Sequence, residues 1–123
     1  MMSKTIMVVE DNQSFREFLA RYLKMFGYNV ISAENGSVAL EILEEEKPDL
    51  IISDVMMPEM DGVQFYLVLK EREDLKSIPV IVLTVRDEFE DIRYASLLGI
   101  DRYLSKPFDP EELRGLLEEI LGT

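Results

Sequence analysis

The sequence predicts a doubly wound α/β domain, in which one five-stranded parallel sheet carries helices on both faces. Three short runs support this fold class, because residues 6–9, 50–52 and 80–83 are wholly apolar, as strands covered on both faces are. Segments with helical spacing separate these runs, so that strand and helix alternate along the chain. Alternation of this kind produces right-handed crossovers and an open parallel sheet.

The strands follow from run length and from the residues that bound them. Each apolar run is short and lies between acidic, Ser, Pro or Thr residues, which favours a strand over a buried helix turn. Two weaker candidates, residues 30–31 and 103–104, complete a set of five. The usual order of five such strands is 2-1-3-4-5, as in flavodoxin-like folds, and we predict that order here.

The helices follow from apolar spacing and from capping residues. Apolar side chains between residues 15 and 26 recur at i, i+3, i+4, i+7, i+8 and i+11, and Gly27 marks the end of this first helix. Asn35 is placed to cap the second helix, and a third helix is expected after Gly62. A fourth is expected over about residues 88–98. Asp109, followed by Pro at the first helical position, predicts the start of the fifth.

Composition narrows the class of protein. The 123 residues, 47% of them hydrophobic, suit a single domain over residues 1–123. The chain has no cysteine and no histidine, which excludes disulfides, thiolate metal sites and histidine proton shuttles. A net charge of -12 repels nucleic acid and anionic membranes, and no apolar run approaches the roughly 18 residues of a membrane span. We therefore expect a cytoplasmic protein that binds neither nucleic acid nor membrane directly.

Polar residues stand at the carboxyl end of nearly every predicted strand. Glu10 and Asp11 follow the first strand, Asp54 the third, Thr84 the fourth and Lys106 the fifth. Ligands of open parallel sheets bind at this edge, and the order 2-1-3-4-5 places the first and third strands side by side. Glu10, Asp11 and Asp54 are therefore expected to converge.

Three converging carboxylates repel one another and call for a cation. With no sulfur or imidazole available, they favour Mg²⁺ or Mn²⁺, and Mg²⁺ typically binds a substrate phosphate as well. Lys106 supplies a cation for the same phosphoryl group and the hydroxyl of Thr84 supplies a donor. Asp54 is then the predicted nucleophile.

The motifs in combination resemble the receiver signature of the response regulators, the CheY-like superfamily of two-component signalling. Each piece is weak by itself, but their order over the whole chain makes the match specific. The matching residues are Glu10-Asp11, Asp54, Met56-Met57-Pro58, Asp61-Gly62, Thr84, Tyr103 and Lys106-Pro107-Phe108.

The resemblance implies a phosphoryl group accepted on Asp54, with Mg²⁺, from a sensor histidine kinase or a histidine phosphotransfer protein. It also implies that the backbone carbonyl of Met56 joins Asp11 and Asp54 as a metal ligand. Glu10 stands where Asp is frequent in the family, so we expect its longer side chain to reach the metal through water rather than directly. Lys106 and Thr84 are implied as the catalytic partners of Asp54.

The resemblance further implies how the signal leaves the site. Thr84 and Tyr103 form the implied switch, which reshapes the face of the fourth helix, fifth strand and fifth helix. That face is expected to bind a downstream protein or to form a homodimer. A receiver is not a turnover enzyme, because it catalyses only its own phosphoryl transfer and autodephosphorylation.

Other classes remain to be weighed. An aspartyl-phosphate phosphatase of related fold needs a second Asp two residues after the nucleophile, where this chain has Met56. A flavin electron carrier needs a phosphate-binding loop after the first strand, where Glu10 and Asp11 would repel the phosphate. A receiver that takes no phosphate also stays open, and so does the choice between a single-domain regulator and the front of a longer one.

Overall fold

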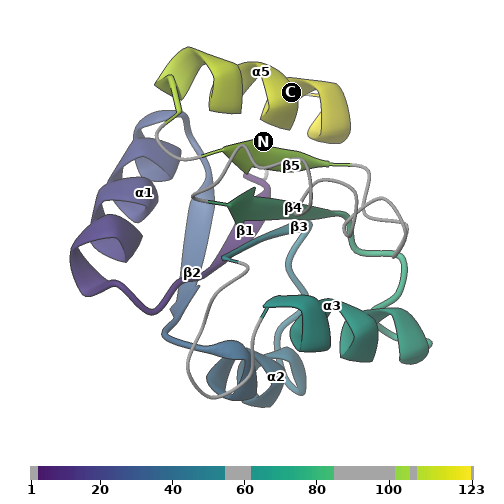
Figure 1. Ribbon diagram of the computed structural model, residues 1–123. Helices are drawn as coiled ribbons and strands as arrows, with labels where there is room; N and C mark the ends of the chain where they lie inside the picture. Colours follow the sequence, from purple (N-terminus) through teal and green to yellow (C-terminus); the bar gives the residue numbers. More distant parts are fainter. Residues whose placement is uncertain (1–2, 55–61, 85–101, 106–107, 123) are drawn as a thin grey trace.

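A computed structural model describes residues 3–54, 62–84, 102–105 and 108–122 (Figure 1). It contains one parallel sheet of five strands in the order β2-β1-β3-β4-β5, which confirms the predicted fold class and strand order. The strands are β1 (Thr5–Val9), β2 (Asn29–Ala33), β3 (Leu50–Asp54), β4 (Val80–Thr84) and β5 (Tyr103–Ser105). The helices are α1 (Gln13–Met25), α2 (Gly36–Leu43), α3 (Gly62–Glu71) and α5 (Pro110–Leu121). The helix predicted over residues 88–98 lies outside the described residues.

The helices form two layers, with α1 and α5 on one face of the sheet and α2 and α3 on the other (Figure 1). Alternate residues of β1 serve the two layers, since Ile6 and Val8 pack with α1 and α5 while Met7 and Val9 pack with α2 and α3. This double coverage explains why the central strands are continuous apolar runs. Within the described ranges, no helix has the length and apolar character needed to cross a membrane.

Side-chain caps fix where the helices begin. The Oδ1 atoms of Asn12 and Asn35 accept hydrogen bonds from backbone N–H groups three residues on, each at 2.9 Å. Asp109 Oδ1 accepts one from the backbone of Glu111, also at 2.9 Å. These bonds satisfy N–H groups that have no partner inside the helix. The predicted caps Asn35 and Asp109 are confirmed, and Gly27 follows α1 with a φ of 98°.

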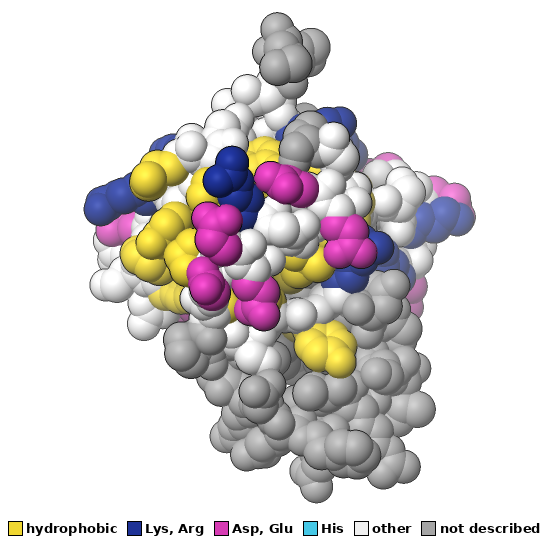
Figure 2. Space-filling model, turned by 90° about the horizontal axis from the view of Figure 1, so that it is seen from above, with side chains coloured by type: hydrophobic (Ala, Val, Ile, Leu, Met, Phe, Trp, Pro, Cys, Tyr) yellow, Lys and Arg dark blue, Asp and Glu magenta, His cyan; other side chains and the backbone are white. Residues whose placement is uncertain are grey.

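An aromatic ladder lines α1 on the side of α5. Successive rings are Phe15, Phe18, Tyr22 and Phe26, with centroid distances of 6.4, 4.8 and 6.0 Å. Phe15 contacts Phe108 at 6.0 Å, and the Arg114 guanidinium lies 5.5 Å from the Phe26 ring. These contacts hold α1 beside α5. Figure 2, which views the molecule from the α5 side, shows apolar side chains gathered next to a group of acidic ones.

A network of ion pairs joins the end of α2 to the segment between α3 and β4. Arg72 donates to Glu44 Oε1 at 2.7 Å and to Asp74 Oδ2 at 2.9 Å, and Lys47 lies 3.4 Å from Asp74. The hydrogen bond to Glu44, followed by that to Asp74, raises the pKa of Arg72. Partial desolvation favours the neutral form of Asp74, but the bonds from Arg72 and Lys47 outweigh it and lower the pKa of this carboxyl below its usual 3.8.

Arg72→Met is expected to lower the urea midpoint of unfolding modestly at neutral pH, because partly exposed ion pairs contribute little. A carboxyl with a lowered pKa stabilises the fold above its ordinary value, and this contribution disappears as pH falls through the lowered value. The difference between wild type and Arg72→Met should therefore shrink below pH 3.8. Urea unfolding at a series of pH values measures it. Lys76→Met serves as the control, because it removes an exposed ion pair to Glu73 that does not involve Asp74. A difference that persists in acid would contradict the role of Asp74.

Candidate functional site

The register of the sheet brings the end of β1 next to the end of β3. Val9 pairs with Ser53, so that Glu10 follows beside Asp54 at the carboxyl edge. The backbone N–H of Glu10 donates to the carbonyl of Ala33 at 3.1 Å, which extends the β1–β2 ladder by one residue. This edge of an open parallel sheet, where the strand order reverses around β1, is the position at which such folds bind ligands.

The three carboxylates differ in exposure. Glu10 is 1% exposed and Asp54, the last residue of β3, is 6% exposed. Asp11 lies one residue further along the chain and is exposed to solvent. The Oε1 atom of Glu10 accepts a hydrogen bond from the backbone N–H of Asn12 at 3.3 Å. Glu10 and Asp54 are thus buried, and Asp11 lies on the solvent side of the group.

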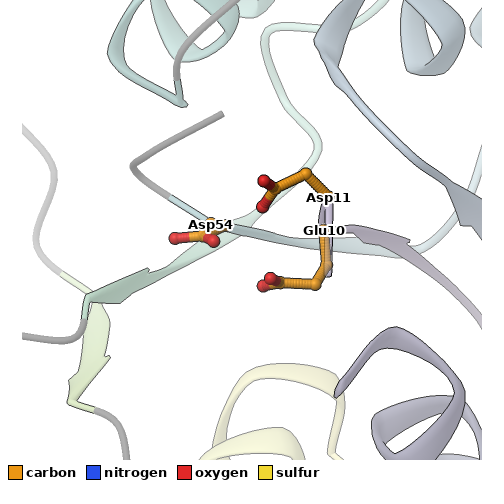
Figure 3. A group of neighbouring side chains, drawn as sticks. All are labelled: Glu10, Asp11 and Asp54. Carbon is orange, nitrogen blue, oxygen red and sulfur yellow. The ribbon is translucent and has the colours of Figure 1, made fainter. Parts of the chain in front are cut away.

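The carboxylates form one cluster. One oxygen from each of Glu10, Asp11 and Asp54 lies within 4.8 Å of the other two. Figure 3 shows the three side chains drawn together from the ends of β1 and β3. Oxygen-only ligand sets of this kind suit hard cations such as Mg²⁺, and a divalent ion would offset the mutual repulsion of the acids. The donor set therefore fits the metal that the sequence predicts.

The other predicted site residues fall partly within the described chain. Thr84 is the last residue of β4 and pairs with Ser105, while Tyr103 begins β5 beside Val82. Tyr103 is partly buried and packs against the core on the α2 and α3 side of the sheet. Met56 and Lys106 lie outside the described residues.

Two residues at this edge were missed in the sequence. Asn12 caps α1, and its position just before the helical period was an available signal. Arg16 donates from Nη1 to the backbone carbonyl of Glu10 at 2.7 Å. Hydrogen bonds from long side chains to backbone carbonyls do not recur at a fixed spacing in the sequence. The sequence therefore contains no comparable signal for the role of Arg16.

The fold and the site together define a doubly wound α/β protein. At its β1–β3 edge lies a cluster of carboxylates that is suited to a cation. Residues 6–118 match the model of the response regulator receiver domain, and the chain belongs to this family. It is a receiver domain of the two-component response regulators. Receiver domains bind Mg²⁺ and take phosphoryl groups from histidine kinases.

Individual relatives agree with this assignment. The alkaline phosphatase synthesis transcriptional regulatory protein PhoP of Bacillus subtilis (strain 168) is 40% identical over 120 residues, which cover 98% of this chain and 49% of PhoP. The receiver domain of a signal transduction histidine kinase from Syntrophus aciditrophicus has a TM-score of 0.91 at 37% identity, covering 98% of this chain and 91% of that one. The chain spans about half the length of several curated relatives that it matches.

A third relative was solved with a metal. The receiver domain of sensor histidine kinase PA1611 from Pseudomonas aeruginosa PAO1 has a magnesium ion coordinated in its active site cleft. It has a TM-score of 0.90 with this chain at 28% identity, over 99% of this chain and 100% of that one.

Proposed function

We propose that this chain is a phosphorylation-activated switch, in which Asp54 accepts a phosphoryl group from a histidine kinase or a histidine phosphotransfer protein. The observation that carries the proposal is the convergence of Glu10, Asp11 and Asp54 within 4.8 Å at the β1–β3 edge. Family membership supports the same chemistry. The 123 residues contain no histidine, so the donor imidazole lies outside them.

The proposed metal ligands are the carboxylates of Asp11 and Asp54 and the backbone carbonyl of Met56. Glu10 is proposed to act through water, which is supported by the hydrogen bond that already engages its Oε1 atom. When bound, Mg²⁺, for which Mn²⁺ can substitute, supplies positive charge that lets an anionic phosphoryl group approach an anionic cluster. The burial of Asp54 limits water around its carboxylate and strengthens its interactions with nearby charges.

In the proposed transfer, a carboxylate oxygen of Asp54 forms a bond to phosphorus. The bond from phosphorus to the donor nitrogen breaks, and the donor imidazole leaves with the electron pair. Lys106 and the hydroxyl of Thr84 are proposed to contact the phosphoryl oxygens and to stabilise their charge. The chain acts once per phosphoryl group and is not a turnover enzyme. We place it in the cytoplasm and treat residues 1–123 as one receiver unit.

The proposal is tested by incubating the chain with acetyl phosphate and measuring its intact mass. One phosphoryl group should be added in the presence of millimolar Mg²⁺ and none after chelation with EDTA, because the cluster needs a cation to accept an anion. Labelling that is equal with and without metal would contradict the metal-dependent transfer. No labelling under either condition would favour a receiver that takes no phosphate.

The signal is proposed to pass from the phosphoryl group through Thr84 and Tyr103. These residues end β4 and begin β5, two strands that pair directly. A new anionic oxygen offers the Thr84 hydroxyl a charge-assisted hydrogen bond of roughly 1.5–3 kcal/mol, enough to shift a near-balanced equilibrium about ten- to a hundredfold. Tyr103, already partly buried against the core, then moves further inward. The predicted fourth helix, which lies outside the described residues, is proposed to form one face with β5 and α5. This face then changes shape and binds a downstream protein or a second copy.

Thr84→Ala is expected to accept phosphate at Asp54 but to lose the change at Tyr103, because it removes the hydroxyl that senses the new oxygen. The measurement is the set of NMR shifts induced by beryllofluoride, which mimics the phosphoryl group. Wild type should show shifts at Tyr103 and across β5 and α5, and Thr84→Ala should show them only around Asp54. Unchanged shifts in the variant would mean that the signal takes another route.

A further inference from the structure

Residues 10–12 join β1 to α1 and carry two of the three clustered carboxylates. This short loop is fastened to its surroundings at both ends. Glu10 N–H donates to the β2 carbonyl of Ala33 at 3.1 Å, and Asn12 Oδ1 accepts from the N–H of Phe15 at 2.9 Å. These two bonds define the path of the loop between the sheet and the first turn of α1.

Arg16 adds a third fastening in the middle of the loop. Its backbone N–H donates to the carbonyl of Asn12 at 2.9 Å, as a helical residue does. Its side chain turns back, and Nη1 donates to the carbonyl of Glu10 at 2.7 Å in a partly buried position. A guanidinium donor makes a shorter and stronger bond than a neutral one, and its planar shape fixes the direction of that bond.

The carbonyl of Glu10 is part of the peptide unit that leads into Asp11. A peptide unit is planar, so a bond that fixes this carbonyl also fixes the direction in which Asp11 leaves the strand. Asp11 is exposed and is repelled by Glu10 and Asp54, which lie within 4.8 Å of it. Repulsion favours conformations in which Asp11 turns outward into water, and a restraint on the backbone limits how far the residue as a whole can move in that direction.

We propose that Arg16 is a positioning residue for the metal centre. Its guanidinium holds the peptide between Glu10 and Asp11, so that the carboxylates of Glu10, Asp11 and Asp54 converge before the ion arrives. The proposal rests on the proposed function, since the ion is the Mg²⁺ that the receiver site is inferred to bind. Residues that orient metal ligands through such contacts typically change metal affinity about ten- to a hundredfold when they are replaced.

The surroundings of Arg16 offer a matched control. Arg16, Arg21 and Lys24 line a groove of about 550 Å³ between α1 and Ser32 of β2. Arg21 has the same charge and lies on the same helix, but it is exposed and five residues beyond Arg16. Replacing either arginine by methionine removes one positive charge from α1. By charge alone, both changes would leave Mg²⁺ affinity equal or raise it slightly.

If Arg16 positions the metal ligands, its replacement should lower Mg²⁺ affinity rather than raise it. In Mg²⁺ titrations followed by the amide NMR signals of residues 10–12 and 54, Arg16→Met is expected to weaken binding about tenfold. Arg21→Met should bind as tightly as wild type. Arg16→Lys, which keeps a cationic donor without the planar fork, should fall between wild type and Arg16→Met. Unchanged or tighter binding by Arg16→Met would overturn the proposal, and so would equal weakening by Arg21→Met.

Measurements without metal separate positioning from a general loss of structure. In EDTA, Arg16→Met should shift the amide signals of Asp11 and Asn12 while its thermal midpoint stays close to that of Arg21→Met. If Arg16→Met does not fold, Arg16→Lys is used for the test instead. Wild-type Mg²⁺ affinity in Arg16→Lys would then show that the planar guanidinium of Arg16 is not required. A wild type that binds no Mg²⁺ would overturn the proposed function itself. Wild-type binding combined with an unaffected Arg16→Met would overturn only the role of Arg16.

Discussion

Asp54→Asn is expected to abolish phosphorylation by acetyl phosphate while leaving the fold intact. The amide has nearly the shape of the carboxylate, so the packing of a residue that is 6% exposed at the end of β3 should survive. The amide lacks the negative charge that makes the carboxylate oxygen a nucleophile and a metal ligand. Intact mass should show one added phosphoryl group in the wild type and none in the variant.

The matched control for Asp54→Asn is Asp109→Asn. Asp109 caps α5 and is not one of the three clustered carboxylates, and asparagine caps helices as well as aspartate does. This variant makes the same chemical change on an acid that is exposed and should be labelled like the wild type. Equal labelling of Asp54→Asn would place the phosphoacceptor at another residue.

Asp11→Asn is expected to remove most of the stabilisation that Mg²⁺ gives the wild type. An ion that binds only the folded state at ten times its Kd adds about 1.4 kcal/mol to the free energy of unfolding. Asp11 supplies the exposed carboxylate of the cluster, and an amide in its place is a neutral and weaker ligand. Thermal melts with and without millimolar Mg²⁺, at constant ionic strength, measure the shift. The wild-type shift should also decline in acid, because protonated carboxylates bind metal poorly.

Glu112→Gln is the control for Asp11→Asn. It removes one negative charge from an exposed position in the first turn of α5, at a residue that is not part of the cluster. Its Mg²⁺-dependent shift should equal that of the wild type. If Asp11→Asn shifted as much as Glu112→Gln, the metal would be bound elsewhere or only by the overall negative charge.

The fold could be predicted where burial imposes a clear pattern. The central strands β1, β3 and β4 are covered on both faces, and their uninterrupted apolar runs show it. The edge strand β2 was predicted only over residues 30–31, although it spans Asn29–Ala33. Its exposed positions include Asn29 and Ser32, whose polar side chains break the run. The strands with a clear sequence pattern are those that helices cover on both faces. The sequence does not show this coverage directly, so the pattern of the edge strand is weak.

The site could be predicted as far as the sheet determines it. Once the strand order places β1 beside β3, the residues that end these strands must meet, and Glu10 and Asp54 do. The bond from Arg16 to the Glu10 carbonyl could not be predicted, since a flexible side chain selects one of many conformations in response to tertiary surroundings. The same holds for the reach of Arg72 to Glu44, 28 residues away in the chain.

Parallel pairing also has a kinetic consequence. Strands that pair here come from distant parts of the chain, and β1 meets β3 across a separation of 44 residues. A loop of that length must close, at an entropic cost, before any contact between the two strands offsets it. Because β1 lies between β2 and β3, both ladders form only after β1 has docked. Until then its unpaired backbone edges and its apolar faces are open to other chains. We therefore expect slow folding, with a tendency to aggregate until β1 has paired with both β2 and β3.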